Sequence, residues 1–119
     1  MKLNHINLVV NNVAEAIYFF ETYFGFKCVE IKGDRIIAVL INEDDFTLVV
    51  SKAKDGNATY PESFHIGFLQ RDAEEVNKVY RQLKTAGLVG EKEPRTIRDS
   101  YGFYFNFENI LIEIATYSN

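Results

Sequence analysis

Two histidines and one glutamate are the residues whose types and positions are best suited to chemistry. His5 and His65 lie in strand-like segments, and each is followed seven residues later by a helix-start residue, Asn12 and Asp72. Glu113 interrupts a strongly apolar run near the end of the chain, where a carboxylate must be exposed, paired or bound to a metal. Two imidazoles and one carboxylate with open coordination positions bind iron(II), and similar sites hold manganese, zinc or nickel. We therefore expect His5, His65 and Glu113 to hold one divalent metal ion.

An internal repeat must position these residues. The chain reads as two copies of a βαβββ module, about residues 1–53 and 62–119, joined by a loop-like segment with the turn residues Asp55, Gly56 and Asn57. One copy alone would leave a face of its sheet uncovered, so it must pair with the other copy or with a second chain. We therefore expect a single α+β domain that forms a homodimer, with the site lying within one chain or shared between two.

The repeat makes four positions equivalent. His5 corresponds to His65, and Val49 of the first copy corresponds to Glu113 of the second. Three of these four side chains can bind a metal, and valine cannot. The equivalence of the two histidines, which are the only ones in the chain, favours a shared role over two separate structural roles.

Strand periodicity assigns further residues to the same faces. Alternation places Asn7 beside His5, and it places Leu111 and Ala115 on the face of Glu113. It leaves open which of Phe103 and Tyr104 points inward. The candidate substrate-binding residues on these faces and in the adjoining strand are Asn7, Thr47, Arg98, Tyr101, Phe103 and Tyr104, and Ser51 is a further polar candidate.

Periodicity and capping residues also predict the elements themselves. Helices are expected from Asn12 to Gly25 and from Asp72 to Gly87, since each has a capping residue at its start and a glycine at its end. Strands are expected at residues 3–10, 26–31, 36–41, 46–51, around 65, 88–91, 95–98, 101–107 and 110–115. Only Glu108 and Asn109 separate the last two strands, which predicts a tight hairpin.

Composition excludes several classes of protein. At 119 residues the chain fits one domain, and its single cysteine, Cys28, excludes an internal disulfide. A net charge of −4 with dispersed basic residues argues against a nucleic-acid partner. No apolar run is long enough to span a bilayer, and the start of the chain lacks a signal-peptide pattern, so we expect a cytoplasmic protein without a membrane partner.

The paired modules, with Asn4-His5-Ile6, His65-Ile66-Gly67-Phe68 and Ile110-Leu111-Ile112-Glu113-Ile114, resemble the vicinal oxygen chelate superfamily. Its members include glyoxalase I, fosfomycin-resistance thiol transferases, extradiol dioxygenases and bleomycin-resistance proteins. The resemblance covers nearly the whole chain and implies an incomplete, U-shaped barrel around a divalent metal that chelates vicinal oxygens of a small molecule. It further implies that His5, His65 and Glu113 are the metal ligands, with Glu113 also catalytic, and that the protein is a lyase, thiol transferase or dioxygenase.

The chain also departs from the pattern of that superfamily. Val49 stands where glyoxalase I has a fourth ligand, and Asn109 stands where an Asp-Pro-Asp-Gly turn is common. The chain ends six residues after Glu113, without the extension that supplies a substrate-binding arginine in the fosfomycin group. Two alternatives to an enzyme stay open. One is a non-catalytic binding protein like the bleomycin-resistance proteins, and the other is a member that keeps the three residues as a polar core network.

Overall fold

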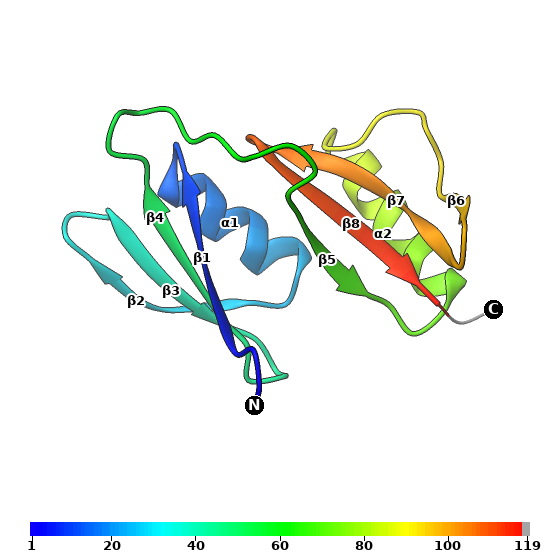
Figure 1. The fold of residues 1–119 in the computed structure, drawn as a ribbon, viewed down its shortest axis with the longest axis horizontal. Coiled ribbons are helices and arrows are strands. Elements are labelled where there is room, and N and C mark those ends of the chain that lie inside the picture. The colour runs from blue at the N-terminus through cyan, green and yellow to red at the C-terminus, as the bar shows by residue number, and fades with distance from the viewer. Residues whose placement is uncertain (118–119) are drawn as a thin grey trace. The chain divides into compact units, whose positions relative to one another are not determined.

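The computed structural model describes residues 1–117, and the chain divides into two compact units that meet at Thr59 and Tyr60. Unit 1 contains β1 (His5–Val10), α1 (Val13–Tyr23), β2 (Lys27–Lys32), β3 (Ile37–Ile41) and β4 (Thr47–Lys52). Unit 2 contains β5 (His65–Leu69), α2 (Ala73–Thr85), β6 (Arg95–Ile97), β7 (Ser100–Phe107) and β8 (Ile110–Thr116). Each unit is therefore one βαβββ module (Figure 1), and the predicted α+β class is confirmed.

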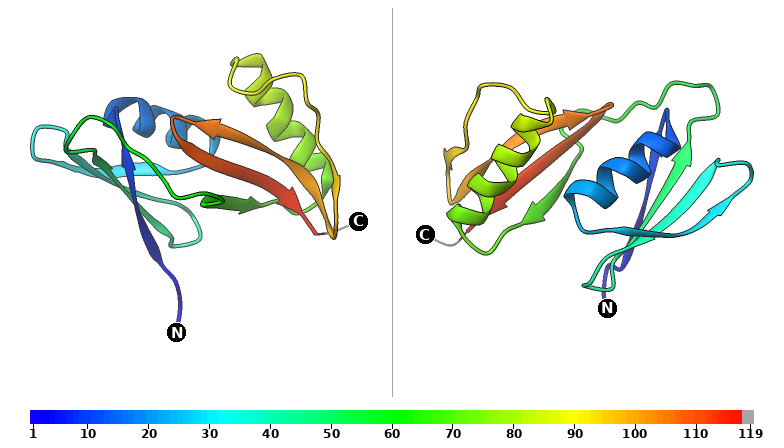
Figure 2. Two further views of the ribbon diagram at one scale, coloured as in Figure 1. Left: turned by 45° about the horizontal axis from the view of Figure 1, so that its top comes forward. Right: turned by 180° about the vertical axis from the view of Figure 1, so that it is seen from behind.

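The two units have the same sheet topology. The strand order is β1-β4-β3-β2 in unit 1 and β5-β8-β7-β6 in unit 2. In each sheet the first and last strands of the module are parallel neighbours, and the other pairs are antiparallel. One helix lies against one face of each sheet (Figure 2). We call the opposite face of each sheet its helix-distal face.

The helices begin where the capping residues predict. The Asn12 side chain accepts a hydrogen bond from the Glu15 backbone N–H at 3.0 Å, and the Asp72 carboxylate accepts one from the Glu75 N–H at 2.9 Å. Each contact satisfies a backbone donor that has no partner within the helix. The two strands that carry the candidate ligands His5 and His65 therefore each lead into a helix with a defined first residue.

The core of each unit lies between its helix and its sheet. In β8 the side chains of Ile110, Ile112 and Ile114 are fully buried on the side of α2, while Leu111 and Glu113 alternate with them on the helix-distal face. In β1, Leu8 and Val10 are buried against α1 in the same way. This alternation is what directs the candidate site residues away from the helices.

One predicted strand is absent from the structure. Residues 88–91 do not form a strand, because the backbone at the start of this segment makes the hydrogen bonds that end α2. Gly87, with φ at 77°, and Leu88 donate hydrogen bonds to the carbonyls of Lys84 and Leu83, at 3.0 and 2.9 Å. This is the Schellman arrangement that ends many helices. The segment after α2 reaches the sheet only at Arg95, as the short strand β6.

The remaining predicted elements are observed with bounds shifted by one or two residues, and the turn at Glu108 and Asn109 joins β7 to β8 as expected. Within residues 1–117, neither helix is long and apolar enough to cross a membrane.

Candidate functional site

Glu113 lies in the middle of the helix-distal face of unit 2. It is on β8, and its register partners are Gly67 on β5 and Tyr104 on β7. Only 19% of its side chain is exposed. A carboxylate this far removed from water is costly unless polar or charged groups surround it. The residues beside Glu113 therefore decide what this position can do.

The imidazole of His65 faces this carboxylate. Its Nε2 atom lies 3.5 Å from Glu113 Oε1, and its Nδ1 atom lies 3.0 Å from the backbone carbonyl oxygen of Ser63. Because a carbonyl oxygen can only accept, the hydrogen of that contact belongs to Nδ1. In the neutral imidazole, the lone pair of Nε2 is then directed toward Glu113. Two electron-rich atoms face each other at a distance longer than a charge-assisted hydrogen bond.

Tyr104 completes this group of side chains. Its ring lies edge-on to the His65 ring, with the centroids 5.7 Å apart. Desolvation, a hydrogen bond with Glu113 and the negative charge of Glu113 all raise the pKa of the Tyr104 phenol. The phenol therefore keeps its proton at neutral pH beside the carboxylate. His65, Tyr104 and Glu113 form what we call the carboxylate cluster of unit 2.

In unit 1, the Nδ1 atom of His5 also contacts an oxygen. The Nδ1 atom of His5 lies 2.8 Å from the Asn4 side-chain oxygen, so the neutral imidazole again carries its free lone pair on Nε2. Metal-binding histidines characteristically donate their second ring nitrogen to an oxygen in this way. His5 is the first residue of β1, and its side chain is exposed.

Strand register shows how the two modules differ. Val49 on β4 is paired with Asn7 and Val39, just as Glu113 on β8 is paired with Gly67 and Tyr104. Unit 1 thus has a valine where unit 2 has the carboxylate. Beside it, Ser51 Oγ donates a hydrogen bond of 2.8 Å to Asn7 Oδ1.

Neither unit alone gathers three metal ligands. Within the described residues of each unit, no three His, Cys, Asp or Glu side chains come together as a metal-binding group. Unit 2 contributes the pair of His65 and Glu113, and unit 1 contributes His5.

The other predicted site residues fall on both faces of their sheets. Thr47 lies on the helix-distal face of unit 1 as the register partner of His5. Tyr101 and Phe103 instead point toward α2, where the Tyr101 hydroxyl donates to Asn77 Oδ1 at 2.7 Å and the Phe103 ring packs edge-on against Tyr80. Arg98 is exposed in the turn between β6 and β7, with φ at 55°.

Two hollows adjoin the carboxylate cluster. One of about 160 Å³ is lined by Gly67, Leu69 and Glu113, among others, and one of about 460 Å³ by residues that include Arg98 and Tyr104. The helix-distal face of unit 2 therefore has room for a small molecule on both sides of the Tyr104 and Glu113 pair.

Sequence reasoning missed three residues around this cluster. Ser63, which orients His65, carries no motif, and only its left-handed backbone, with φ at 67°, marks it. Lys92 and Arg95 line a third hollow beside Tyr104. Their spacing around Pro94 ahead of a short strand was a usable signal, since two cations and a proline are typical of an edge strand.

Comparison with known proteins identifies a family and a relative with a described activity. The sequence profile of the Glyoxalase/Bleomycin resistance protein/Dioxygenase superfamily matches residues 2–114. A Bacillus subtilis (strain 168) protein described as a "probable trivalent organoarsenical cleaving enzyme" is 32% identical over 97 residues, which is 81% of this chain. The chain spans 64% of the length of that relative.

Solved structures share the fold. A "possible glyoxalase" from Bacillus cereus is 34% identical, with a TM-score of 0.82 over 96% of this chain and 97% of the other. The fosfomycin resistance protein FosX from Listeria monocytogenes is 21% identical, with a TM-score of 0.76 over 98% of this chain and 93% of the other. The second likeness concerns the fold alone.

Proposed function

The chain belongs to the Glyoxalase/Bleomycin resistance protein/Dioxygenase superfamily, and from this premise we propose that it is a metal-dependent enzyme acting on two adjacent oxygens of a small molecule. The observation that carries the proposal is the approach of His65 Nε2 to Glu113 Oε1 at 3.5 Å. Both atoms are electron donors when the imidazole is neutral, and a cation shared between them would satisfy both.

The donor set fits a divalent transition metal. An imidazole nitrogen and a carboxylate oxygen suit iron, manganese, nickel and zinc alike, so the donors do not select among these four ions. We propose that His65 and Glu113 supply two ligands and that His5, whose Nε2 lone pair is also available, supplies the third. The same chain or a second copy in a homodimer could bring His5 to the other two.

Each ligand in this proposal is oriented by a neighbour. The Ser63 carbonyl fixes the ring of His65, and the Asn4 side chain does the same for His5. The protonated phenol of Tyr104 would support Glu113 from the neighbouring strand, since the two residues are register partners and Glu113 raises the pKa of the phenol. Such supporting contacts typically change metal affinity about 10- to 100-fold when removed. A bound divalent ion would act as a Lewis acid that stabilises negative charge developing on the substrate oxygens.

The reaction class we propose is a lyase, thiol-transfer or dioxygenase reaction, with Glu113 as the catalytic carboxylate. Cleavage of organoarsenicals, which the name of the Bacillus subtilis relative suggests, finds less support. Trivalent arsenic is held by soft thiolates, and the only cysteine here is Cys28 in unit 1, whose Sγ contacts the Glu30 carbonyl at 3.6 Å. We propose an oxygen-bearing substrate, since a divalent metal held by His65 and Glu113 would bind oxygen donors. Asn7, Thr47 and Arg98 stay candidates for contacts with it.

The test is metal content and affinity in a matched series of variants. Chelator-treated protein is titrated with iron(II), manganese, nickel and zinc, and bound metal is measured by elemental analysis. We expect about one ion per chain in the parent, as for a three-ligand catalytic site. His65→Gln and Glu113→Gln should lose most of it, and His5→Gln should weaken binding as well.

Glu74→Gln is the control, because Glu74 is an exposed carboxylate of the same unit on α2. It should bind metal like the parent. A folded parent that takes up none of the four ions would refute the enzyme proposal and leave non-catalytic binding of a small molecule, as in bleomycin-resistance proteins.

A further inference from the structure

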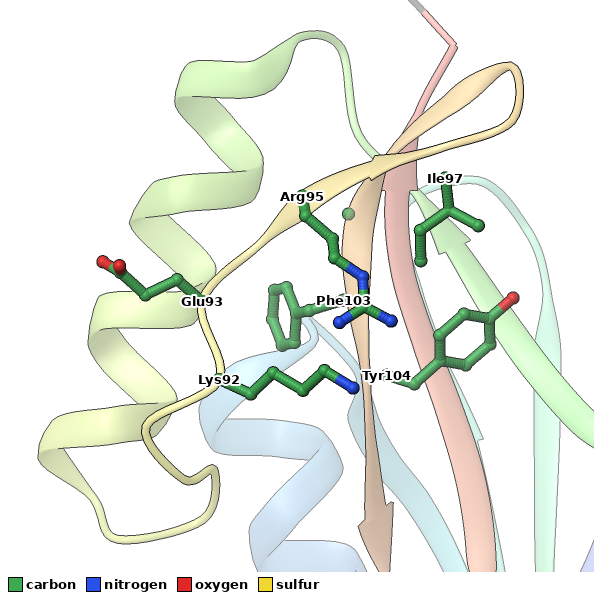
Figure 3. Close-up of a pocket in the computed structure, with 7 residues that line it drawn as sticks. Lys92, Glu93, Arg95, Ile97, Phe103 and Tyr104 are labelled. Carbon is green, nitrogen blue, oxygen red and sulfur yellow. The ribbon is translucent and has the colours of Figure 1, made fainter.

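A third hollow lies at the edge of the unit 2 sheet, between β7 and the segment that leads into β6, and residues from both faces of β7 line it. Its volume is about 90 Å³, which is enough for a few water molecules or a compact group. The side chains that line it are Lys92, Glu93, Arg95, Ile97, Phe103 and Tyr104 (Figure 3). A compact group such as a phosphonate or carboxylate has this size, and a large aromatic molecule does not.

Two of these side chains are cations directed into the same space. Figure 3 shows the guanidinium of Arg95 and the ammonium of Lys92 converging beside Tyr104, while the carboxylate of Glu93 points away. Within the part of the chain that the structure describes, neither cation forms an ion pair. Nearby, Lys84 pairs with Glu91 at 3.0 Å, so carboxylates in this segment do neutralise other cations. Both cations are exposed to solvent and are therefore available to an anion that enters the hollow.

Strand register places Arg95 on the same face as the carboxylate cluster. Arg95 is paired with Gly102, and Ile97 with Ser100, which puts all four on the face of Tyr104. Tyr104 itself lines the hollow and contacts both His65 and Glu113. A molecule that reaches Glu113 past Tyr104 would thus place one end between Lys92 and Arg95.

We propose that Lys92 and Arg95 form an anion-binding subsite that receives an anionic group of the substrate, a phosphonate, phosphate or carboxylate. That this anion is part of the substrate rests on the proposed function, whereas anion binding itself does not. The two cations give complementary contacts, since guanidinium can bind two oxygens at once and ammonium acts as a point charge. They also offset the repulsion that Glu113 would exert on an anionic substrate.

The subsite can be tested without the substrate. The full chain is treated with a chelator, so that no anion can bind through a metal, and is titrated with inorganic phosphate, methylphosphonate and acetate. Binding is followed by the NMR shifts of backbone amides, and dimethyl methylphosphonate serves as a neutral probe of similar shape. We expect shifts centred on residues 92–97 and 102–104 for the anions and none for the neutral probe. A preference for phosphate and methylphosphonate over acetate would identify a dianionic group, and the reverse would identify a carboxylate.

The decisive variants are Lys92→Gln and Arg95→Gln, each of which should weaken anion binding about tenfold, with higher salt weakening it further. Lys78→Gln and Arg81→Gln, made as single variants, form the control, because each removes one positive charge from an exposed position of α2. Equal weakening in the control, or shifts spread over the whole surface, would overturn the subsite. Metal titration of the same variants separates the two proposals, since Lys92→Gln and Arg95→Gln should keep the metal affinity of the parent.

Discussion

Replacing Gly102 by alanine should destabilise the strand pair that carries Tyr104 and Glu113. A Cβ atom at this position would collide with the Ile114 carbonyl oxygen and lie 2.8 Å from both Cα and Cβ of Ala115. Two of these three atoms belong to the backbone of β8, so rotation of a side chain cannot relieve the contacts. The strands must separate by at least about 0.6 Å to restore ordinary contact with Ala115, and by more to clear the Ile114 carbonyl oxygen.

The cost follows from the nature of the contact. Overpacking in a close-packed region typically costs 1–3 kcal/mol, and a backbone collision belongs at about 3 kcal/mol. For a chain of this length each kcal/mol lowers the melting temperature by about 4 °C, so we expect a decrease of roughly 12 °C. Urea unfolding and thermal melting followed by circular dichroism measure both quantities.

Gly90 and Gly67 provide the matched comparison. A Cβ at Gly90 would have nothing within 4 Å, so Gly90→Ala should change stability by about 0.5 kcal/mol or less. A Cβ at Gly67 would make an ordinary contact of 3.5 Å with Glu113 Oε1, so Gly67→Ala should fold normally and alter only the surroundings of the carboxylate. If Gly102→Ala proved as stable as Gly90→Ala, the close approach of β7 to β8 would be wrong.

Two further predictions concern the carboxylate cluster and the core. The Tyr104 phenol should titrate above the ordinary tyrosine pKa of 10.0, and Glu113→Gln should reduce that shift without abolishing it, because desolvation is its largest cause. Since the folded state holds this proton more tightly, the protonated phenol contributes stability below about pH 10, and this contribution is lost as the pH rises through the folded pKa. NMR of ring-labelled tyrosine, with Tyr104→Phe used to assign the signal, measures the pKa shift. An unshifted Tyr104 would contradict the contact with Glu113. In β8, Ile112→Ala should cost about 2–5 kcal/mol because Ile112 is fully buried, whereas Leu111→Ala on the opposite face should cost less. Equal costs in urea unfolding would contradict the assigned faces.

Much of this fold could be predicted because local rules and the tertiary structure agree. Alternation in the first and last strands assigned His5 and Glu113 to the helix-distal faces, and the capping residues Asn12 and Asp72 fixed both helix starts. The predicted strand at residues 88–91 was wrong because Leu88 ends α2 instead. Apolar residues just after a glycine fit both outcomes, and only the hydrogen bond to Leu83 distinguishes them.

The site was less predictable, because it depends on pairing between distant strands. The sequence left the choice between Phe103 and Tyr104 open, and the pairing of Tyr104 with Glu113 places Tyr104 on the helix-distal face. Tyr101 lies on the opposite face of β7 from Tyr104, where its hydroxyl donates to Asn77 of α2 and its side chain lines a separate hollow. Ser63 acts through its backbone carbonyl, which any residue type would provide, so its side chain gave no signal.

The short edge strand β6 has a consequence for how the substrate range of such a protein can change. Only three residues, Arg95–Ile97, join the sheet there, and Lys92 precedes them in an exposed segment. Substitutions at these positions disturb few backbone hydrogen bonds and little of the core, while His65 and Glu113 are held by longer strands. Substitutions can therefore change the proposed anion-binding residues at the edge of unit 2 without changing the carboxylate cluster at its centre. Relatives that share the carboxylate cluster should differ first in the segment between α2 and β7.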